Sequence, residues 1–84
     1  HEGLLELKKH DEENQTQYME TLRVYLEQHL SATQAARELF IHRSTFLYRL
    51  DRIKEILQSE LDDPEEIFYL ELSFRLLEQE QEKE

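Results

Sequence analysis

Residues 32–54 read ATQAARELFIHRSTFLYRLDRIK, and the spacing of the apolar residues in this stretch predicts two helices joined by a tight turn. The first helix is short, and its small apolar face consists of Ala32, Ala35, Ala36 and Leu39. The second helix runs from about residue 43 to 58, and its apolar side consists of Phe46, Leu50, Ile53 and Leu57. Because the opposite side of the second helix stays polar, we predict a helix-turn-helix over residues 32–58, whose second helix can enter the DNA major groove.

Local signals mark the ends of the first helix of the motif. Ser31 and Gln34 stand at the positions of a capping box, in which each side chain satisfies a backbone donor at the helix start. Phe40 and Ile41 form the turn that follows. Spacing alone leaves two alternatives open, because many helical hairpins share this pattern and bind no DNA.

Three supporting helices are expected at residues 4–10, 17–29 and 64–79, with an acidic connection over residues 11–17. The second of these helices should bury one face, formed by Tyr18, Leu22, Tyr25, Leu26 and His29. The last helix has Asp63 as its N-cap, Pro64 in its first position and Glu66 placed to complete a capping box. We expect the tail over residues 78–84 to fray.

The last helix carries more apolar surface than one small core needs. One stripe consists of Ile67, Leu70, Phe74 and Leu77, and a second set consists of Phe68, Tyr69, Leu72 and Leu76. We expect this surplus, together with Leu4, Leu5 and Leu7, to meet a second copy of the chain in a homodimer.

Composition predicts a single all-α domain over residues 1–84, a small bundle of about five helices with the last helix packing across it. The 84 residues include one glycine and one proline, and Leu, Glu, Gln and Arg are abundant, which favours helices over hairpins. The absence of cysteine excludes disulfides and thiolate metal sites and suits a cytoplasmic protein. No apolar run approaches the roughly 18 residues that span a bilayer, so we expect no membrane partner.

Charge is distributed unevenly along the chain. The net charge is -10, which argues at first against a nucleic-acid partner. Residues 31–58, however, hold five cationic side chains against three carboxylates, a net charge of +2, so the rest of the chain carries -12. A DNA-reading face on an acidic surface would give this distribution, and so would an ordinary helical surface of mixed charge.

The residue string itself resembles a known family. ATQAARELFIHRSTFLYRLDRIK (residues 32–54) is similar to the C-terminal helix-turn-helix of bacterial transcription regulators of the PucR and sugar-diacid regulator (CdaR) type. TLRVYLEQH (residues 21–29) resembles the preceding helix of that family, and LDDPEEIFYLELSFRLL (residues 61–77) its closing helix. The motif resembles the DNA-binding end of Fis-like proteins more distantly.

This resemblance implies a DNA-binding output domain in the C-terminal part of a longer regulator of catabolic genes, such as those for purine or sugar-acid use. Two positions depart from the family pattern. Ser44 stands where the family usually has asparagine, and Leu47 where it often has arginine, so base preference and phosphate contacts can differ here. The glycine common near residues 58–60 is also absent, which affects a loop more than the reading face.

The candidate DNA-binding residues are Thr33, Gln34, His42, Arg43, Ser44, Thr45, Tyr48, Arg49 and Arg52. Arg43 can fork onto a phosphate or a guanine edge, and the alternative is a solvated first-turn arginine. Ser44 and Thr45 offer donors at a helix start and otherwise act as caps. Tyr48 can bond to a phosphate or pack on a thymine methyl group, and otherwise lies across its neighbours.

The remaining candidates have supporting roles. Arg49 and Arg52 should attract the DNA backbone electrostatically, and Thr33 and Gln34 are phosphate-contact candidates, although capping can occupy Gln34. His42 matches a family position.

Other chemistries find little support in the sequence. His42 has no second ligand at metal spacing, so we expect no metal or cofactor. The carboxylates Asp62, Asp63, Glu65 and Glu66 fit helix capping better than catalysis or a calcium loop. We therefore expect no enzyme and no small-molecule ligand.

Two functional hypotheses remain. The first is sequence-specific binding of double-stranded DNA, at a palindromic site, by a homodimer. The second is a helical protein-interaction or oligomerisation module that binds no DNA. We prefer the first, because local charge, motif spacing and family resemblance agree.

Overall fold

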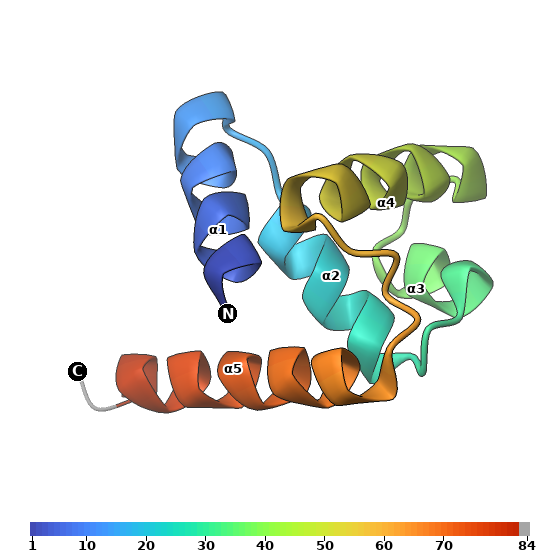
Figure 1. Ribbon diagram of the computed structural model, residues 1–84. Helices are drawn as coiled ribbons and strands as arrows, with labels where there is room; N and C mark the ends of the chain where they lie inside the picture. The colour runs from blue at the N-terminus through green and yellow to red at the C-terminus, as the bar shows by residue number, and fades with distance from the viewer. Residues whose placement is uncertain (83–84) are drawn as a thin grey trace.

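The computed structural model describes residues 1–82, which form five α-helices (Figure 1). They are α1 (Glu2–Asn14), α2 (Tyr18–Glu27), α3 (Ala32–Glu38), α4 (Arg43–Leu57) and α5 (Pro64–Glu82). No strand occurs among the described residues. The predicted all-α bundle of about five helices is confirmed.

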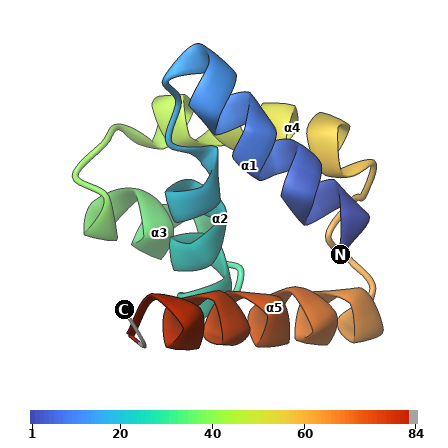
Figure 2. The ribbon, with the colours of Figure 1, turned by 90° about the vertical axis from the view of Figure 1, so that its left-hand side faces the viewer.

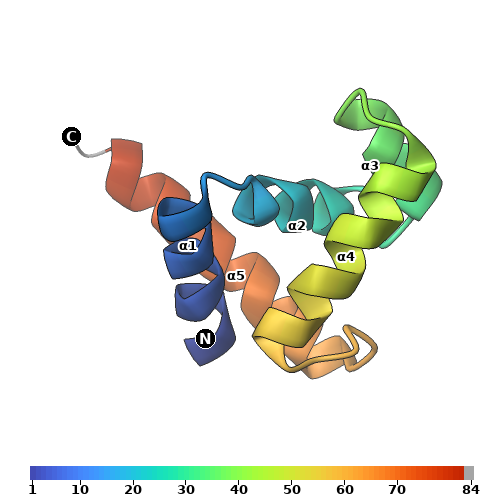
Figure 3. The same ribbon diagram turned by 90° about the horizontal axis from the view of Figure 1, so that it is seen from above.

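Helix α4 lies at the centre of the packing, because α1, α2 and α3 all contact it. The predicted apolar side of α4 is confirmed: Phe46, Leu50, Ile53 and Leu57 are all buried. Seen from above, α2 lies between α1 and α3, with α4 running beside all three (Figure 3). Fully buried side chains from four helices meet in this core, namely Leu7, Leu22, Phe46, Ile53 and Leu70.

Helix α5 lies across one side of the bundle and packs mainly on α2, as Figures 1 and 2 show. This confirms the expected position of the last helix. Leu70 and Phe74 face the core and are buried, whereas Phe68, Tyr69, Leu72 and Leu76 remain exposed. The described fold therefore covers only one stripe of α5.

The first two helices differ in length from the prediction. Helix α1 spans Glu2–Asn14 rather than 4–10, because the expected connection begins only at Gln15, which ends the helix in a left-handed conformation. The Asp11 carboxylate lies on α1 and accepts hydrogen bonds from the backbone N atoms of Tyr18 (2.9 Å) and Met19 (2.8 Å). It thus caps α2, whose own N-cap residue Gln17 makes no side-chain cap.

Helix α2 also ends earlier than the predicted residue 29. His29 and Leu30 both have positive φ values, 56° and 65°, which end the helix. The expectation that His29 shares the buried face of α2 is wrong, because His29 is exposed. Of the rest of that face, Tyr18, Leu22 and Leu26 are buried as expected, and Tyr25 is half-buried against the core.

Part of the predicted dimer surface is wrong. Leu4 and Leu7 are buried in the core of their own chain, since α1 packs on both α2 and α4. Gly3 permits this close approach: a Cβ atom there would lie 3.0 Å from the carbonyl oxygen of Leu57. Leu5 is the leucine of this set that stays exposed, at 69%.

The helix starts were predicted only in part. Ser31 caps α3 as expected, since its Oγ accepts from the backbone N of Gln34 at 3.2 Å. The reciprocal half of this capping box is wrong, because the backbone N of Ser31 donates to the carbonyl oxygen of Gln28 at 3.1 Å. Asp63 caps α5 by accepting from the backbone N of Glu65 at 3.0 Å. The capping-box role of Glu66 is wrong, because its carboxylate contacts the Ser59 hydroxyl and lies 3.1 Å from Nε2 of His1.

Helix α5 extends beyond the predicted end at residue 79. It continues to Glu82, so the expected fraying from residue 78 is wrong as far as residue 82. Residues 83 and 84 lie outside the described residues.

Candidate nucleic-acid interface

Helices α3 and α4 pack against each other and are joined by a tight turn at Leu39–His42. The backbone N atoms of Phe40 and Ile41 donate to the carbonyl oxygens of Arg37 (3.2 Å) and Ala36 (3.1 Å). These bonds close the end of α3, and Phe40 turns the chain with a φ of 57°. The buried Ala35 and Ala36 have small side chains that let the two helices approach closely. This geometry is a helix-turn-helix.

The start of α4 is capped by a histidine. Nδ1 of His42 accepts from the backbone N of Ser44 at 3.4 Å and lies 3.0 Å from the Ser44 hydroxyl oxygen. His42 therefore satisfies one backbone donor and orients Ser44, while other N–H groups of the first turn remain available for an anion.

The outer face of α4 is polar and accessible. Arg43, Ser44 and Thr45 are exposed in its first turn, and Tyr48 is 65% exposed one turn later. None of these residues carries a negative charge, and the first carboxylate on this side is that of Asp51. The face can therefore present an arginine, two hydroxyl groups and a phenol to a ligand without repelling phosphates.

Helix α3 adds a second accessible group. Thr33 and Gln34 are both exposed near its start. The backbone N of Ser31 donates to the carbonyl oxygen of Gln28 at 3.1 Å, so capping does not occupy the amide side chain of Gln34. In a helix-turn-helix bound to DNA, the first helix crosses the DNA backbone. Both candidates lie at the start of α3, where they can face phosphates.

Arg49 and Arg52 differ from the other candidates, because protein partners hold both side chains. Nη1 of Arg49 donates to Oγ1 of Thr21 on α2 at 3.3 Å, and Arg49 is half-buried. Arg52 pairs with Glu55 at 2.6 Å, and the Glu55 charge raises the pKa of the Arg52 guanidinium. The nine candidates thus form an exposed group on α3 and the first turns of α4, and a flank of two arginines.

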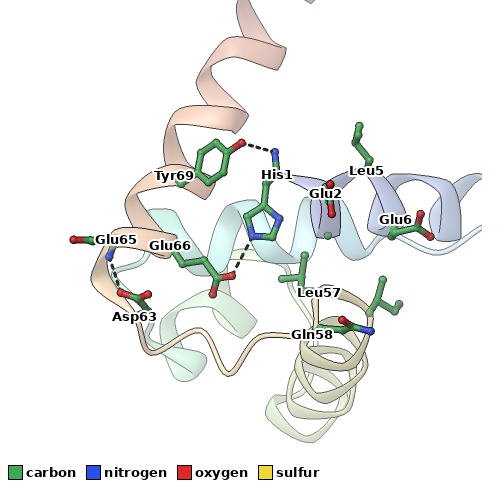
Figure 4. Close-up of a pocket in the computed structure, with 12 residues that line it drawn as sticks. His1, Glu2, Leu5, Glu6, Leu57, Gln58, Asp63, Glu65, Glu66 and Tyr69 are labelled. Carbon is green, nitrogen blue, oxygen red and sulfur yellow. Dashed lines mark hydrogen bonds and ion pairs between the residues drawn. The ribbon is translucent and has the colours of Figure 1, made fainter.

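A hollow of about 940 Å³ lies between the start of α1, the end of α4 and the start of α5 (Figure 4). Its lining includes Glu2, Glu6, Asp63, Glu65 and Glu66. These carboxylates repel phosphates, so the hollow contrasts with the outer face of α4. Within residues 1–82, no three His, Asp or Glu side chains are grouped to hold a metal ion.

Two features of the interface escaped sequence reasoning. The first is the contact between Arg49 and Thr21, which joins residues 28 positions apart and has no local signal. The second is the conformation of Phe40, which is 94% exposed with a positive φ. A signal for the second existed, because the turn of a helix-turn-helix often contains glycine and this turn has none.

The fold and the exposed start of α4 define a helix-turn-helix domain of the DNA-binding class. None of the helices within residues 1–82 combines the length and apolar character that crossing a bilayer requires. Comparison with known families gives a match to the PucR C-terminal helix-turn-helix domain over residues 18–76. The chain therefore belongs to this family. It is a DNA-binding domain of transcription regulators and not an enzyme.

Three relatives from Bacillus subtilis (strain 168) are similar to the chain. The purine catabolism regulatory protein is 41% identical over 58 residues, which are 69% of this chain and 11% of the relative. The proline-responsive transcriptional activator PutR is 40% identical over 57 residues, 68% of this chain and 14% of the relative. The DNA-binding transcriptional activator AdeR is 32% identical over 74 residues, 88% of this chain and 18% of the relative.

The chain thus spans less than a fifth of the length of these relatives. No solved structure matches it.

Proposed function

We propose that this chain is the sequence-specific output domain in the C-terminal part of a longer bacterial regulator, and that the regulator controls catabolic genes in the cytoplasm. The named roles of the relatives in purine catabolism and proline response support the class of target genes. The observation that carries the proposal is the exposed, acid-free first half of the α4 outer face. The chain has a net charge of -10, so carboxylates would be expected on this face if its only function were protein interaction.

Arg43, Ser44 and Thr45 enter the major groove with the N-terminus of α4. Arg43 reads a guanine or clamps a phosphate with its two forked donors, and the hydroxyl groups contact base edges or phosphates. Tyr48 follows one turn deeper along the groove wall. Thr33, Gln34 and His42 hold the phosphates beside the groove, while Arg49 and Arg52 add positive charge at its flank.

One recognition helix reads few base pairs, so the domain acts as a homodimer on a palindromic site. The exposed stripe of α5 supports a second copy as the occupant, because its pattern is symmetric about Leu72. Phe68 and Leu76 lie four residues before and after Leu72, and both are exposed. When two α5 helices pair antiparallel around Leu72, each Phe68 meets the Leu76 of its partner copy.

The same register pairs charged and aromatic groups. Tyr69 and Arg75 lie three residues on either side of Leu72, and both are exposed. An antiparallel pair therefore sets each guanidinium against an aromatic ring, a favourable cation–π arrangement. In this register the exposed Glu71 lies beside the symmetry axis, close to the Glu71 of the partner copy, so these like charges repel and added salt strengthens the dimer.

The test is binding of the 84-residue chain to a pool of random duplexes at two salt concentrations, followed by sequencing. We expect enrichment of a palindromic sequence and weaker binding at the higher salt concentration, because phosphate contacts release counterions. Arg43→Ala should reduce the affinity by about 10-fold, which corresponds to about 1.4 kcal/mol of binding free energy. Lys8→Ala is the matched control, because it removes an exposed positive charge from α1.

Two outcomes would contradict the proposal. A folded chain that enriches no sequence at low salt would favour the interaction module. Equal losses for Arg43→Ala and Lys8→Ala would show that binding depends on total charge and not on the start of α4.

A further inference from the structure

Phe40 combines two locally unfavourable features. Its side chain is 94% exposed, the highest value among the exposed large apolar residues of the described chain. Its backbone has a φ of 57°, in the left-handed region that side chains with a Cβ atom rarely adopt. A glycine would satisfy the same turn without strain and without exposing an aromatic ring. The fold of residues 1–82 therefore provides no contact that explains a phenylalanine at this position.

Two arginines lie near Phe40 in the sequence. Arg37 precedes Phe40 by three residues and Arg43 follows it by three, and both are exposed. The ion pairs of residues 1–82 include neither arginine. A short segment that exposes an apolar ring and two cationic side chains fits a ligand that alternates negative charge with apolar surface.

Arg37 also continues the exposed group of α3. It lies four residues after Thr33 and three after Gln34, so the three residues share one side of the helix. The neighbouring Glu38 is exposed as well and offsets one charge in the total. Binding of a ligand at this segment therefore depends on the positions of the Arg37 and Arg43 guanidinium groups and not on the net charge of the segment.

The position of the turn identifies the ligand. In a DNA-bound helix-turn-helix the first helix crosses the DNA backbone, and the start of the second contacts base edges. The turn between them must pass over the edge of the groove, where deoxyribose rings alternate with phosphates. This surface is both charged and apolar, as the turn requires.

We propose that the segment Arg37–Arg43, which spans the turn, is a second DNA contact, in which the Phe40 ring packs on deoxyribose and Arg37 binds a phosphate. This inference rests on the proposed entry of α4 into the major groove. Because sugars and phosphates are the same in every sequence, the contact adds affinity for any duplex and does not contribute to base preference.

The test uses Phe40→Gly and Phe40→Asn in the 84-residue chain, because both residues accept a left-handed backbone and both lack the ring. The probes are a duplex enriched from the random pool and a shuffled duplex of the same length. We expect about 10-fold weaker binding to both probes, because both variants lose the apolar area that the ring buries against deoxyribose. The Tm should stay equal or rise, and the dimer mass should not change.

Salt dependence separates the ring from its arginine neighbour. The Phe40 variants should keep the wild-type slope of log affinity against log salt, because the ring displaces no counterion. Arg37→Ala should reduce the magnitude of this slope by about 0.9, the value for one phosphate contact. Gln15→Gly is the matched backbone control, because Gln15 has the same φ of 57° at the end of α1. It should leave DNA affinity unchanged.

Several results would overturn the inference. Wild-type binding to DNA with no loss in either Phe40 variant would remove the ring contact while leaving the proposed function intact. A loss confined to the enriched duplex would assign Phe40 to base reading. A fall in Tm that accompanies the loss in both variants would assign the ring to the fold. A wild-type chain that binds neither duplex would overturn both the proposed function and this inference.

Discussion

The guanidinium of Arg49 in α4 donates a hydrogen bond to the hydroxyl oxygen of Thr21 in α2 across 3.3 Å. Thr21 is fully buried, and its hydroxyl donates in turn to the carbonyl oxygen of Gln17 at 2.7 Å. One hydroxyl group thus links the recognition helix to the first turn of α2. This link adds a polar contact between α4 and α2 to the apolar packing that joins them.

We predict that Thr21→Val reduces the free energy of unfolding by about 1 kcal/mol, because it removes both hydrogen bonds while it keeps the shape of the side chain. The Tm should fall by about 4–8 °C, measured by circular dichroism. Thr33→Val is the control, since Thr33 is an exposed helical threonine. An equal fall in both variants would mean that the threonine hydroxyl contributes no specific link.

A double-mutant cycle isolates the bond between the two residues. Thr21→Val, Arg49→Met and the double variant should show a coupling energy of about 0.5–1.5 kcal/mol in urea unfolding. Additive effects would contradict the link.

A second prediction concerns the capping of α2 from α1. Asp11→Ala should reduce the free energy of unfolding by about 1–2 kcal/mol, because it removes the acceptor for the backbone N atoms of Tyr18 and Met19. Asp11→Asn, which keeps one oxygen acceptor, should lose less. The exposed neighbour Glu12 provides the control variant Glu12→Ala, and urea unfolding gives all three values. A stability of Asp11→Ala equal to that of Glu12→Ala would show that the cap does not stabilise α2.

The helices were predictable from the sequence wherever apolar periodicity was strong. The four residues of the α4 core side are all buried as expected, since their spacing leaves one way to pack the helix. Leu4 and Leu7 show the limit of this method. Periodicity predicts that they lie on an apolar face, but it does not predict whether that face packs within the same chain or against a second copy. In the structure, α1 packs on α2 and α4, so both leucines belong to the core.

The contacts at the starts of helices were harder to predict. Glu66 stands at a capping-box position, yet it bonds to Ser59 and to His1, which is 65 residues away. The Asp11 cap likewise depends on how α1 and α2 are placed in space. The same holds for the candidate site. The helical periodicity predicts which residues at the start of α4 are exposed, but it does not predict the contact between Arg49 and Thr21.

A third prediction tests the reading face. Tyr48→Ala should weaken binding to the enriched duplex by about 10-fold while the Tm changes by less than about 4 °C, because a side chain that is 65% exposed contributes little to the core. Tyr48→Phe separates the two roles: it keeps affinity when the ring packs on a thymine methyl group and loses it when the hydroxyl bonds to a phosphate. Fluorescence anisotropy measures both. Unchanged affinity of Tyr48→Ala would remove Tyr48 from the interface.

The fourth prediction concerns the α5 pair. Leu72→Glu should convert the dimer into a monomer in sedimentation equilibrium, because it places two carboxylates at the symmetry axis, beside the exposed Glu71 of each copy. The fold should persist, since Leu72 is 44% exposed in the single chain. Binding to a palindromic duplex should weaken, while binding to a single half-site should stay the same.

Gln17→Glu is the matched control for this prediction, because Gln17 is exposed at the start of α2 and lies outside the predicted dimer surface. It adds the same charge, so a dimer that dissociates only through general repulsion would respond equally to both variants. Salt provides an independent check. Dimerisation through the acidic α5 should strengthen as salt rises, whereas DNA binding should weaken, because screening acts on repulsion in one case and on attraction in the other. A dimer that weakens with salt would place the interface elsewhere on the molecule.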